Sequence, residues 1–401
     1  MPLTTLSTTT TARVHTALER ARWRLAAADA AIVATQVAVT AIPAPTGNEG
    51  IRGAWVARRF QALGLEGVHV DEVGNVIGRR PGPIEAPGIV LAAHLDTVFP
   101  REAVGEVVHD GDRIIAPGIG DNGRGLATLL AIAEAIDGFA VRTLRPVTFV
   151  ATTGEEGAGD LRGAKAFFEK EPSWFGAIAL DGTGDDLIVH RGVGSKRFRV
   201  TLSGPGGHSW SDYGTANPLH AASQAMAKLS GLILPAEPRT SLTLARVGGG
   251  LSINSIPGSA WFEVDMRSTS PDPLRRLESA LRGIVETAVL EANATRARRT
   301  IGLECRIEVI GDRPCGELPP DHPLVMAAMT ATRLIDRAPE LASASTDANV
   351  PLSLGIPAIA IGGGGRGGDV HTLGEWYEND EGPRGIARAL TIAVAAAGMD
   401  A

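Results

Sequence analysis

The sequence predicts an α/β fold: a mostly parallel sheet with helices on both faces, and a smaller α+β domain inserted into the chain. Three observations lead to this prediction. Apolar runs such as GIVLAA (88–93) and PVTFVA (146–151) are continuously hydrophobic, which is typical of strands buried on both faces. Helical stretches alternate with these runs, as expected for parallel strands joined by crossovers. Beyond Gly192 the pattern changes to alternating apolar and polar residues, which marks a sheet with one solvated face.

The first part of the chain supplies a succession of helices and buried strands. A helical stretch over 15–40 ends before Pro43 and Pro45, whose rings stop a helix. An amphipathic helix over 48–63 ends at Gly64. The other elements predicted here are strands over 68–71, 75–79, 88–93, 146–151 and 177–180, and helices over 126–136 and 161–169.

The remaining elements define the insertion and the return to the first pattern. Strands are predicted over 196–203, 241–247, 260–267 and 303–310, and helices over 218–229 and 273–290. A helix over 323–334, a strand over 358–361 and a helix over 382–397 then resume the α/β style. We therefore expect a larger domain made of residues 1–192 and 313–401, with residues 193–312 inserted between its two parts.

Composition excludes several classes of protein. The chain has 401 residues, a formal net charge of −7 and 44% hydrophobic residues, which argues against intrinsic disorder and against nucleic-acid or anionic-membrane binding. Its two cysteines, Cys305 and Cys315, are too few for a disulfide framework and favour a reducing compartment. No secretory signal and no apolar run of about 20 residues is recognised, so a cytoplasmic protein is expected.

Histidines and carboxylates follow the predicted strands, where ligands sit in an open α/β sheet. They are His94, Asp96, Asp121, Glu155, Glu156, Asp181 and His371. Each alone has a plain structural explanation, such as a helix cap for Asp121 or a solvated acidic turn for Glu155 and Glu156. Together they point to a cation, because carboxylates that converge without one repel each other.

Imidazole and carboxylate ligands without cysteine suit Zn²⁺, or else Co²⁺ or Mn²⁺, better than Ca²⁺ or Mg²⁺. Two metal ions with one bridging carboxylate need about five protein ligands, and five residues qualify: His94, Asp121, Glu156, Asp181 and His371. Asp96 lies two residues after His94 on the same side of a strand, so it could accept the other imidazole N–H. Glu155 points away from Glu156 and would act as general base for the attacking water.

The segments HLDTVFP, GIGDNGRGLA, TTGEEGAGDLRGA, ALDG and GPGGHSW, with the final His371, resemble a family of co-catalytic dinuclear zinc hydrolases. Its members include peptidase T, carboxypeptidase G, aminoacylases, acetylornithine deacetylases and succinyl-diaminopimelate desuccinylases. The resemblance implies His94 and Asp181 on one metal, Glu156 and His371 on the other, and Asp121 bridging. It also implies that the inserted domain is a lid through which the protein forms a homodimer.

Further site residues follow from the resemblance. His208 in GPGGHS matches a histidine that stabilises the tetrahedral oxyanion, although by itself it is more simply a turn histidine. Asn254 and Arg267 match substrate-binding positions of the lid. Gly363 and Gly364, in the glycine-rich loop 362–368, resemble a loop whose backbone N–H groups bind a substrate carboxylate.

The function predicted from these residues is metal-dependent hydrolysis of an amide bond. Asp181 and the segments STDANVP and HTLGEWY are similar to peptidase T, which favours a di- or tripeptidase or an aminopeptidase acting on small peptides. The alternative is an N-acyl-amino-acid deacylase with the same chemistry. A more remote alternative is a non-catalytic binding protein that keeps the fold.

Overall fold

A computed structural model describes residues 8–138, 141–171, 173–297 and 301–399. The chain forms two compact units: one combines Met1–Gly192 with Glu317–Ala401, and the other is Val193–Gly316. The inserted unit therefore ends at Gly316 rather than at 312, where the sequence pattern placed its boundary.

The larger unit is built on a nine-stranded sheet with the order β1-β2-β6-β3-β7-β17-β8-β15, in which β16 also pairs with β8. The strands are β1 (Glu66–Val70), β2 (Val76–Arg80), β3 (Ile89–His94), β6 (Val147–Thr152), β7 (Gly176–Leu180), β8 (Leu187–Gly192), β15 (Gly316–Glu317), β16 (Glu340–Ala344) and β17 (Ala358–Ile361). The central strands β6, β3, β7 and β17 run parallel, and all of their residues are buried. The predicted mostly parallel α/β fold is confirmed.

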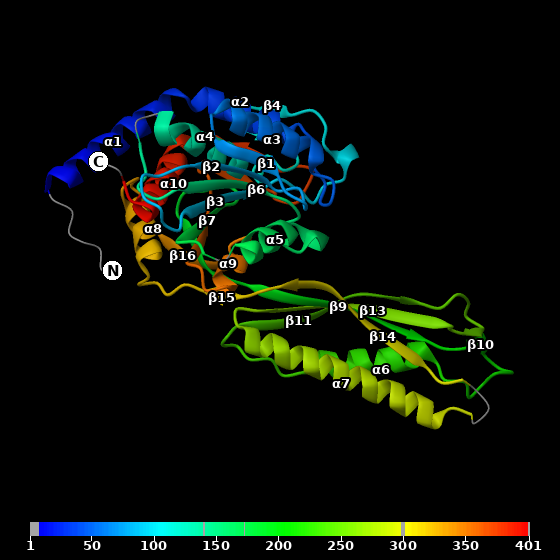
Figure 1. The fold of residues 1–401 in the computed structure, drawn as a ribbon. Helices are drawn as coiled ribbons and strands as arrows, with labels where there is room; N and C mark the ends of the chain where they lie inside the picture. The colour runs from blue at the N-terminus through cyan, green and yellow to red at the C-terminus, as the bar shows by residue number, and fades with distance from the viewer. Residues whose placement is uncertain (1–7, 139–140, 172, 298–300, 400–401) are drawn as a thin grey trace. The chain divides into compact units, whose positions relative to one another are not determined.

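Helices cover both faces of this sheet (Figure 1). On one face lie α3 (Gly50–Ala62), α4 (Gly123–Gly138) and α10 (Gly382–Ala397), and on the other lie α5 (Arg162–Lys170) and α9 (Asn349–Ser353). An outer layer consists of α1 (Thr8–Ala27), which packs on α10, and α2 (Asp29–Thr40), which packs on α4, while α8 (Pro323–Arg333) also contacts α10. The single helix expected over 15–40 is thus two helices, separated at Ala28.

A small antiparallel sheet, which the sequence analysis does not predict, connects two distant segments of the larger unit. Its order is β18-β19-β5-β4, and its strands are β4 (Val108–Asp110), β5 (Arg113–Ile115), β18 (Arg366–Gly368) and β19 (Trp376–Glu378). Ile114, Ala116, Ile119 and Tyr377 form its own buried core. The sheet joins the segment that leads to Asp121 with the segment around His371. Single 3₁₀ turns occur at η1 (Arg101–Ala103) and η2 (Gly157–Gly159).

The inserted unit is a four-stranded antiparallel sheet with the order β11-β13-β9-β14. Its elements are β9 (Gly194–Ser203), α6 (Pro218–Ser230), β11 (Thr240–Gly249), β13 (Ser259–Ser268), α7 (Pro271–Thr295) and β14 (Glu304–Arg313). Residues alternate between buried and partly exposed along β13, because both helices pack on the same apolar face. A short ladder of β10 (Gly207–His208) and β12 (Ser255–Ile256) extends from it. No helix among the described residues has the length and apolar character needed to cross a membrane.

Candidate active site

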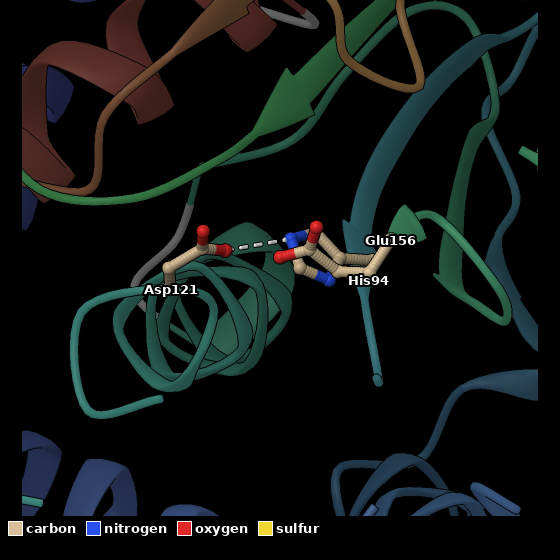
Figure 2. Close-up of side chains that lie close together, drawn as sticks. All are labelled: His94, Asp121 and Glu156. Atoms are coloured by element: carbon tan, nitrogen blue, oxygen red, sulfur yellow. Dashed lines mark ion pairs between the residues drawn. The ribbon is translucent and has the colours of Figure 1, made fainter. Parts of the chain in front are cut away.

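The ends of neighbouring strands in the larger unit bring the predicted ligands together. His94 is the last residue of β3, and Asp181 directly follows β7, its neighbour in the sheet. Glu156 lies in the loop after β6, and Asp121 comes two residues before α4. Figure 2 shows the side chains of His94, Asp121 and Glu156 turned toward one another. Each of these three residues offers one donor atom, and the donor atoms lie within 4.8 Å of one another.

The five predicted metal ligands form two sets of contacting side chains, and Asp121 belongs to both. Nε2 of His94 lies 2.9 Å from Oδ1 of Asp121 and 3.7 Å from Oδ1 of Asp181. Nε2 of His371 lies 3.1 Å from the other oxygen of Asp121, Oδ2, and 2.9 Å from Oε1 of Glu156. Each imidazole nitrogen thus faces two carboxylates, and Asp121 belongs to both sets. This is the pairing that the resemblance implies, although the roles of the residues as ligands stay a prediction.

The ring of His94 has a defined orientation. Its Nδ1 lies 3.0 Å from the carbonyl oxygen of Asp96, so this nitrogen carries the proton that is donated to the carbonyl. In the neutral ring this leaves the lone pair on Nε2, the nitrogen that faces Asp121 and Asp181, and this tautomer is the form of histidine that binds a metal. The carboxylate of Asp96 is farther away, with Oδ1 3.6 Å from Nδ1. The expected orienting contact from Asp96 therefore comes mainly from its main chain.

The Asp96 carboxylate makes a different set of hydrogen bonds. Oδ1 accepts the backbone N–H of Glu155, and Oδ2 accepts the backbone N–H of Glu156, both at 3.0 Å. Oδ2 also accepts from the hydroxyl of Thr46 at 2.8 Å. Burial acts to raise the pKa of Asp96, but contacts with His94, the N–H of Glu156 and the hydroxyl of Thr46 lower it to about 2. Asp96 thus fixes the main chain of both glutamates.

The cluster raises the pKa values of His94, His371 and Glu156 and lowers that of Asp121, the carboxylate that both histidines contact. The hydrogen bond to Asp121 is the main cause that raises the pKa of His371 to about 9. Burial and then the neighbouring Asp121 charge raise the pKa of Glu156 to about 7. Burial acts to lower the pKa of His94, but hydrogen bonds to Asp121 and Asp181 raise it well above its usual value. Three carboxylates around two imidazole nitrogens therefore favour additional cations between them, and this donor set fits a pair of divalent metal ions.

His371 reaches the cluster through an uncommon backbone conformation. Its φ is 65°, in the left-handed region that non-glycine residues seldom adopt. Such conformations persist where the surrounding structure holds them in place, and they concentrate at functional sites.

The structure corrects one group of predicted substrate-binding residues. The N–H of Gly363 donates to the carbonyl of Gly182 at 3.0 Å, and that of Gly364 donates to the carbonyl of Gly184 at 2.9 Å. Because both N–H groups already have partners, they do not form a cradle for a substrate carboxylate. A Cβ on Gly362 would collide with the carbonyl oxygen of Thr183, so the glycines allow two backbones to touch. The loop therefore supports the segment that follows Asp181.

The remaining predicted residues lie in the inserted unit. His208 is exposed on β10, and its Nδ1 accepts the backbone N–H groups of Trp210 at 3.2 Å and Ser211 at 3.4 Å. Asn254 lies in the adjacent strand connection, where its carbonyl accepts the N–H of Ser209 at 3.0 Å. Arg267, near the end of β13, donates to Asp265 at 2.7 Å. The roles of His208, Asn254 and Arg267 toward a substrate stay predictions.

Two buried glutamates of the site were not singled out from the sequence. Glu49 accepts the N–H of Gly154 at 3.1 Å and an Arg162 N–H at 2.7 Å, next to the loop of Glu155. Glu375 accepts three backbone N–H groups of the loop that leads to Asp121. The pattern GIGD contains two glycines, whose backbone N–H groups need acceptors when they are buried. This need is the one feature of the sequence that points to a buried acceptor such as Glu375.

Residues 90–394 match the model of peptidase family M20/M25/M40, so the chain belongs to this family. Succinyl-diaminopimelate desuccinylase of Corynebacterium glutamicum is 28% identical over 347 residues, covering 83% of this chain and 88% of that protein. The fold is similar to a tripeptidase from Staphylococcus aureus (TM-score 0.76, 22% identity, 91% of this chain and 98% of that one). It is also similar to YxeP of Bacillus subtilis, described as a dinuclear metal-binding peptidase (TM-score 0.66, 17% identity, 91% and 97% covered).

The predicted resemblance is thereby confirmed. The protein is a metallohydrolase that acts on amide C–N bonds, and its His94, Asp121 and Glu156 form a cluster whose donor atoms could hold a metal ion.

Proposed function

We propose that this protein hydrolyses small peptides at a dinuclear centre, with His94 and Asp181 holding one metal ion and Glu156 and His371 the other. Asp121 would bind both ions. The observation that carries the proposal is the placement of Asp121, whose two carboxylate oxygens face two different imidazoles at 2.9 and 3.1 Å. A carboxylate shared in this way is the arrangement that a bridged pair of metals requires.

The bound ions would supply polarisation of the scissile carbonyl and activation of water. Glu155 accepts the proton of the attacking water and then donates it to the nitrogen of the leaving amine as the C–N bond breaks. Glu155 thereby returns to its starting protonation state. Its nearly buried position and the hydrogen bond from its N–H to Asp96 favour a fixed orientation for this transfer. Glu155 therefore takes the general-base role, and its neighbour Glu156 takes that of a ligand.

His208 would donate a hydrogen bond to the developing oxyanion. Because Nδ1 accepts two backbone N–H groups, the proton of the neutral imidazole lies on Nε2, which leaves this nitrogen as a donor. Asn254 and Arg267, which is 44% exposed, would contact other parts of the substrate.

We propose a peptide with a free N-terminus as the substrate, which is consistent with the likeness of the fold to a tripeptidase. A second candidate is an N-acyl amino acid, favoured by the similarity to a desuccinylase along 83% of the chain. The test compares kcat/KM for one tripeptide with that for its N-acetyl and N-succinyl forms, using enzyme loaded with Zn²⁺. Faster turnover of the free tripeptide supports the peptidase, and preference for a blocked form rejects it in favour of the deacylase.

We also propose a homodimeric protein of a reducing compartment such as the cytoplasm. Both cysteines are free thiols, which suits such a compartment. In the inserted unit, β14 is an edge strand with half-exposed Val309 and Ile310, which supports pairing between two copies. Light scattering coupled to size-exclusion chromatography tests the dimer, and a monomer at micromolar concentration contradicts it.

A further inference from the structure

The carboxylate of Glu375 lies fully buried among backbone N–H groups of the loop before α4. Oε2 accepts the N–H of Gly118 at 2.9 Å, and Oε1 accepts the N–H groups of Gly120 and Asp121, both at 2.8 Å. Glu375 is thus hydrogen-bonded to the main chain of the residue whose side chain faces both histidines. These three bonds join segments more than 250 positions apart in the sequence.

The main chain of Glu375 is also held from two sides. Its carbonyl accepts the N–H of Ala116 at 3.0 Å, and its own N–H donates to the carbonyl of Thr372 at 3.2 Å, next to His371. Glu375 therefore contacts the loop of the bridging residue and the segment of the last histidine at the same time.

Glycine at two positions suits the shape of this loop. Gly118 has φ 77°, a conformation that favours glycine, and a Cβ there would lie 2.6 Å from Cγ2 of Thr97. A Cβ on Gly120 would lie 3.3 Å from Oε1 of Glu375 and 3.2 Å from Thr183, so glycine at this position leaves room for the carboxylate.

We propose that Glu375 is a positioning residue that couples the two metal positions, an inference that rests on the proposed function. A bridging carboxylate must place both oxygens at metal-ligand distances of about 2.0–2.2 Å at once. A small rotation of the Asp121 main chain would keep one of these bonds and lose the other. By fixing the N–H of Asp121 and of the two glycines before it, Glu375 sets the orientation in which one carboxylate serves both ions.

The test is a stepwise metal titration of the full-length protein with Zn²⁺, by calorimetry and by metal analysis after dialysis. Glu375→Gln keeps the shape of the side chain, but its amide nitrogen cannot accept N–H groups on its side. We expect the variant to bind the first ion with affinity close to wild type and the second at least about tenfold more weakly, as for other residues that orient ligands. Glu378→Gln, on the adjacent strand β19 and paired with Arg366, is the matched control and should bind both ions as the wild type does.

The ratio of the two affinities separates positioning from a structural role, because a variant that is merely less stable binds both ions normally while folded. If Glu375→Gln is folded by circular dichroism and binds both ions with wild-type affinities, the proposal is overturned. Should that variant not fold, Glu375→Asp, which keeps the charge but is one methylene shorter, is measured in the same way and against the same criterion. Wild-type protein that takes up fewer than two ions contradicts the proposed function itself, a result distinct from either outcome for the variants.

Discussion

Oδ1 of Asp96 accepts the backbone N–H of Glu155 at 3.0 Å, which joins the segment after β3 to the loop after β6. The second oxygen of the same carboxylate holds Glu156, so the proposed base and the proposed ligand beside it share one anchor. A carboxylate has acceptor positions on both oxygens, and that property makes this double contact feasible.

Asp96→Asn is therefore expected to lower activity without abolishing the fold. The amide replaces one acceptor by a donor, and one of the two glutamate N–H groups loses its partner. We expect kcat to fall by about 10- to 100-fold, the usual range for residues that orient a metal site. Steady-state kinetics checks this, with Thr46→Val as a control that removes one hydrogen bond to Asp96 and leaves both N–H bonds in place. Equal activity of Asp96→Asn and wild type contradicts the anchor role.

Glu155→Ala should retain metal and lose turnover. Without a general base at this position, we expect kcat to fall by about 10²–10⁴-fold while two ions per chain remain bound. Turnover and metal content are measured on the same preparation. Glu156→Ala is the contrasting variant, in which metal itself should be lost. Near-normal turnover of Glu155→Ala with full metal content would remove Glu155 from the mechanism.

Substitutions of His208 distinguish its two ring nitrogens. Asparagine can accept the N–H groups of Trp210 and Ser211 but offers no donor at the Nε2 position, whereas glutamine places an amide N–H near it. We expect His208→Asn to lower kcat by about 10²–10³-fold, the range for loss of an oxyanion donor, and His208→Gln to retain more activity. The ratio of the two kcat values is the readout. A ratio of one, or the reverse order, shows that Nε2 donates nothing to the transition state.

Arg52 should contribute to stability through three carbonyl groups. Its buried guanidinium donates to Ile42 at 2.9 Å, Leu95 at 2.7 Å and Thr40 at 3.2 Å, and burial lowers its pKa to about 10. Lysine cannot match this planar fork, so Arg52→Lys leaves buried carbonyls unpaired and should lower the free energy of unfolding by roughly 2–3 kcal/mol. Urea denaturation measures the loss. Arg58→Lys, exposed on the same helix, is expected to leave stability unchanged, and equal effects of the two substitutions refute the assignment.

Removal of metal should lower the melting temperature. Ions that bind the folded chain but not the unfolded chain stabilise the fold by about 2.7 kcal/mol per site when their free concentration is a hundred times Kd. In addition, the carboxylates of the cluster repel each other more strongly without them. Scanning calorimetry before and after chelation, and after Zn²⁺ is added back, measures the shift. A melting temperature that does not respond to chelation argues against metals at this cluster.

The central strands and most of the site could be predicted because both follow from local patterns. The run GIVLAA is buried on both faces of the sheet. The next residue, His94, therefore lies at the edge formed by the carboxyl ends of the strands. Glu156 and Asp181 follow strands in the same way. Parallel strands then bring these ends together without further information.

What the sequence did not reveal depends on contacts between distant segments. The strands of the small sheet, such as β5 and β19, have three residues, too few for a period to be recognised. Glu375 acquires its partners only because that sheet carries it to the loop of Asp121. Likewise, glycine composition in 362–368 cannot show whether an N–H is occupied, and here Gly363 and Gly364 are both paired.

The two points at which the chain passes between the units are far apart in the sequence but close together in space. In the larger unit, the N–H of Leu318 donates to the carbonyl of His190 at 2.9 Å, and in the inserted unit Ser195 is the partner of Arg313 across β9 and β14. Because each unit has neighbouring ends, closing either with a short turn costs little chain entropy. The insertion is thus a module that could be excised or exchanged for another of different length, while every strand that carries a predicted ligand keeps its neighbours.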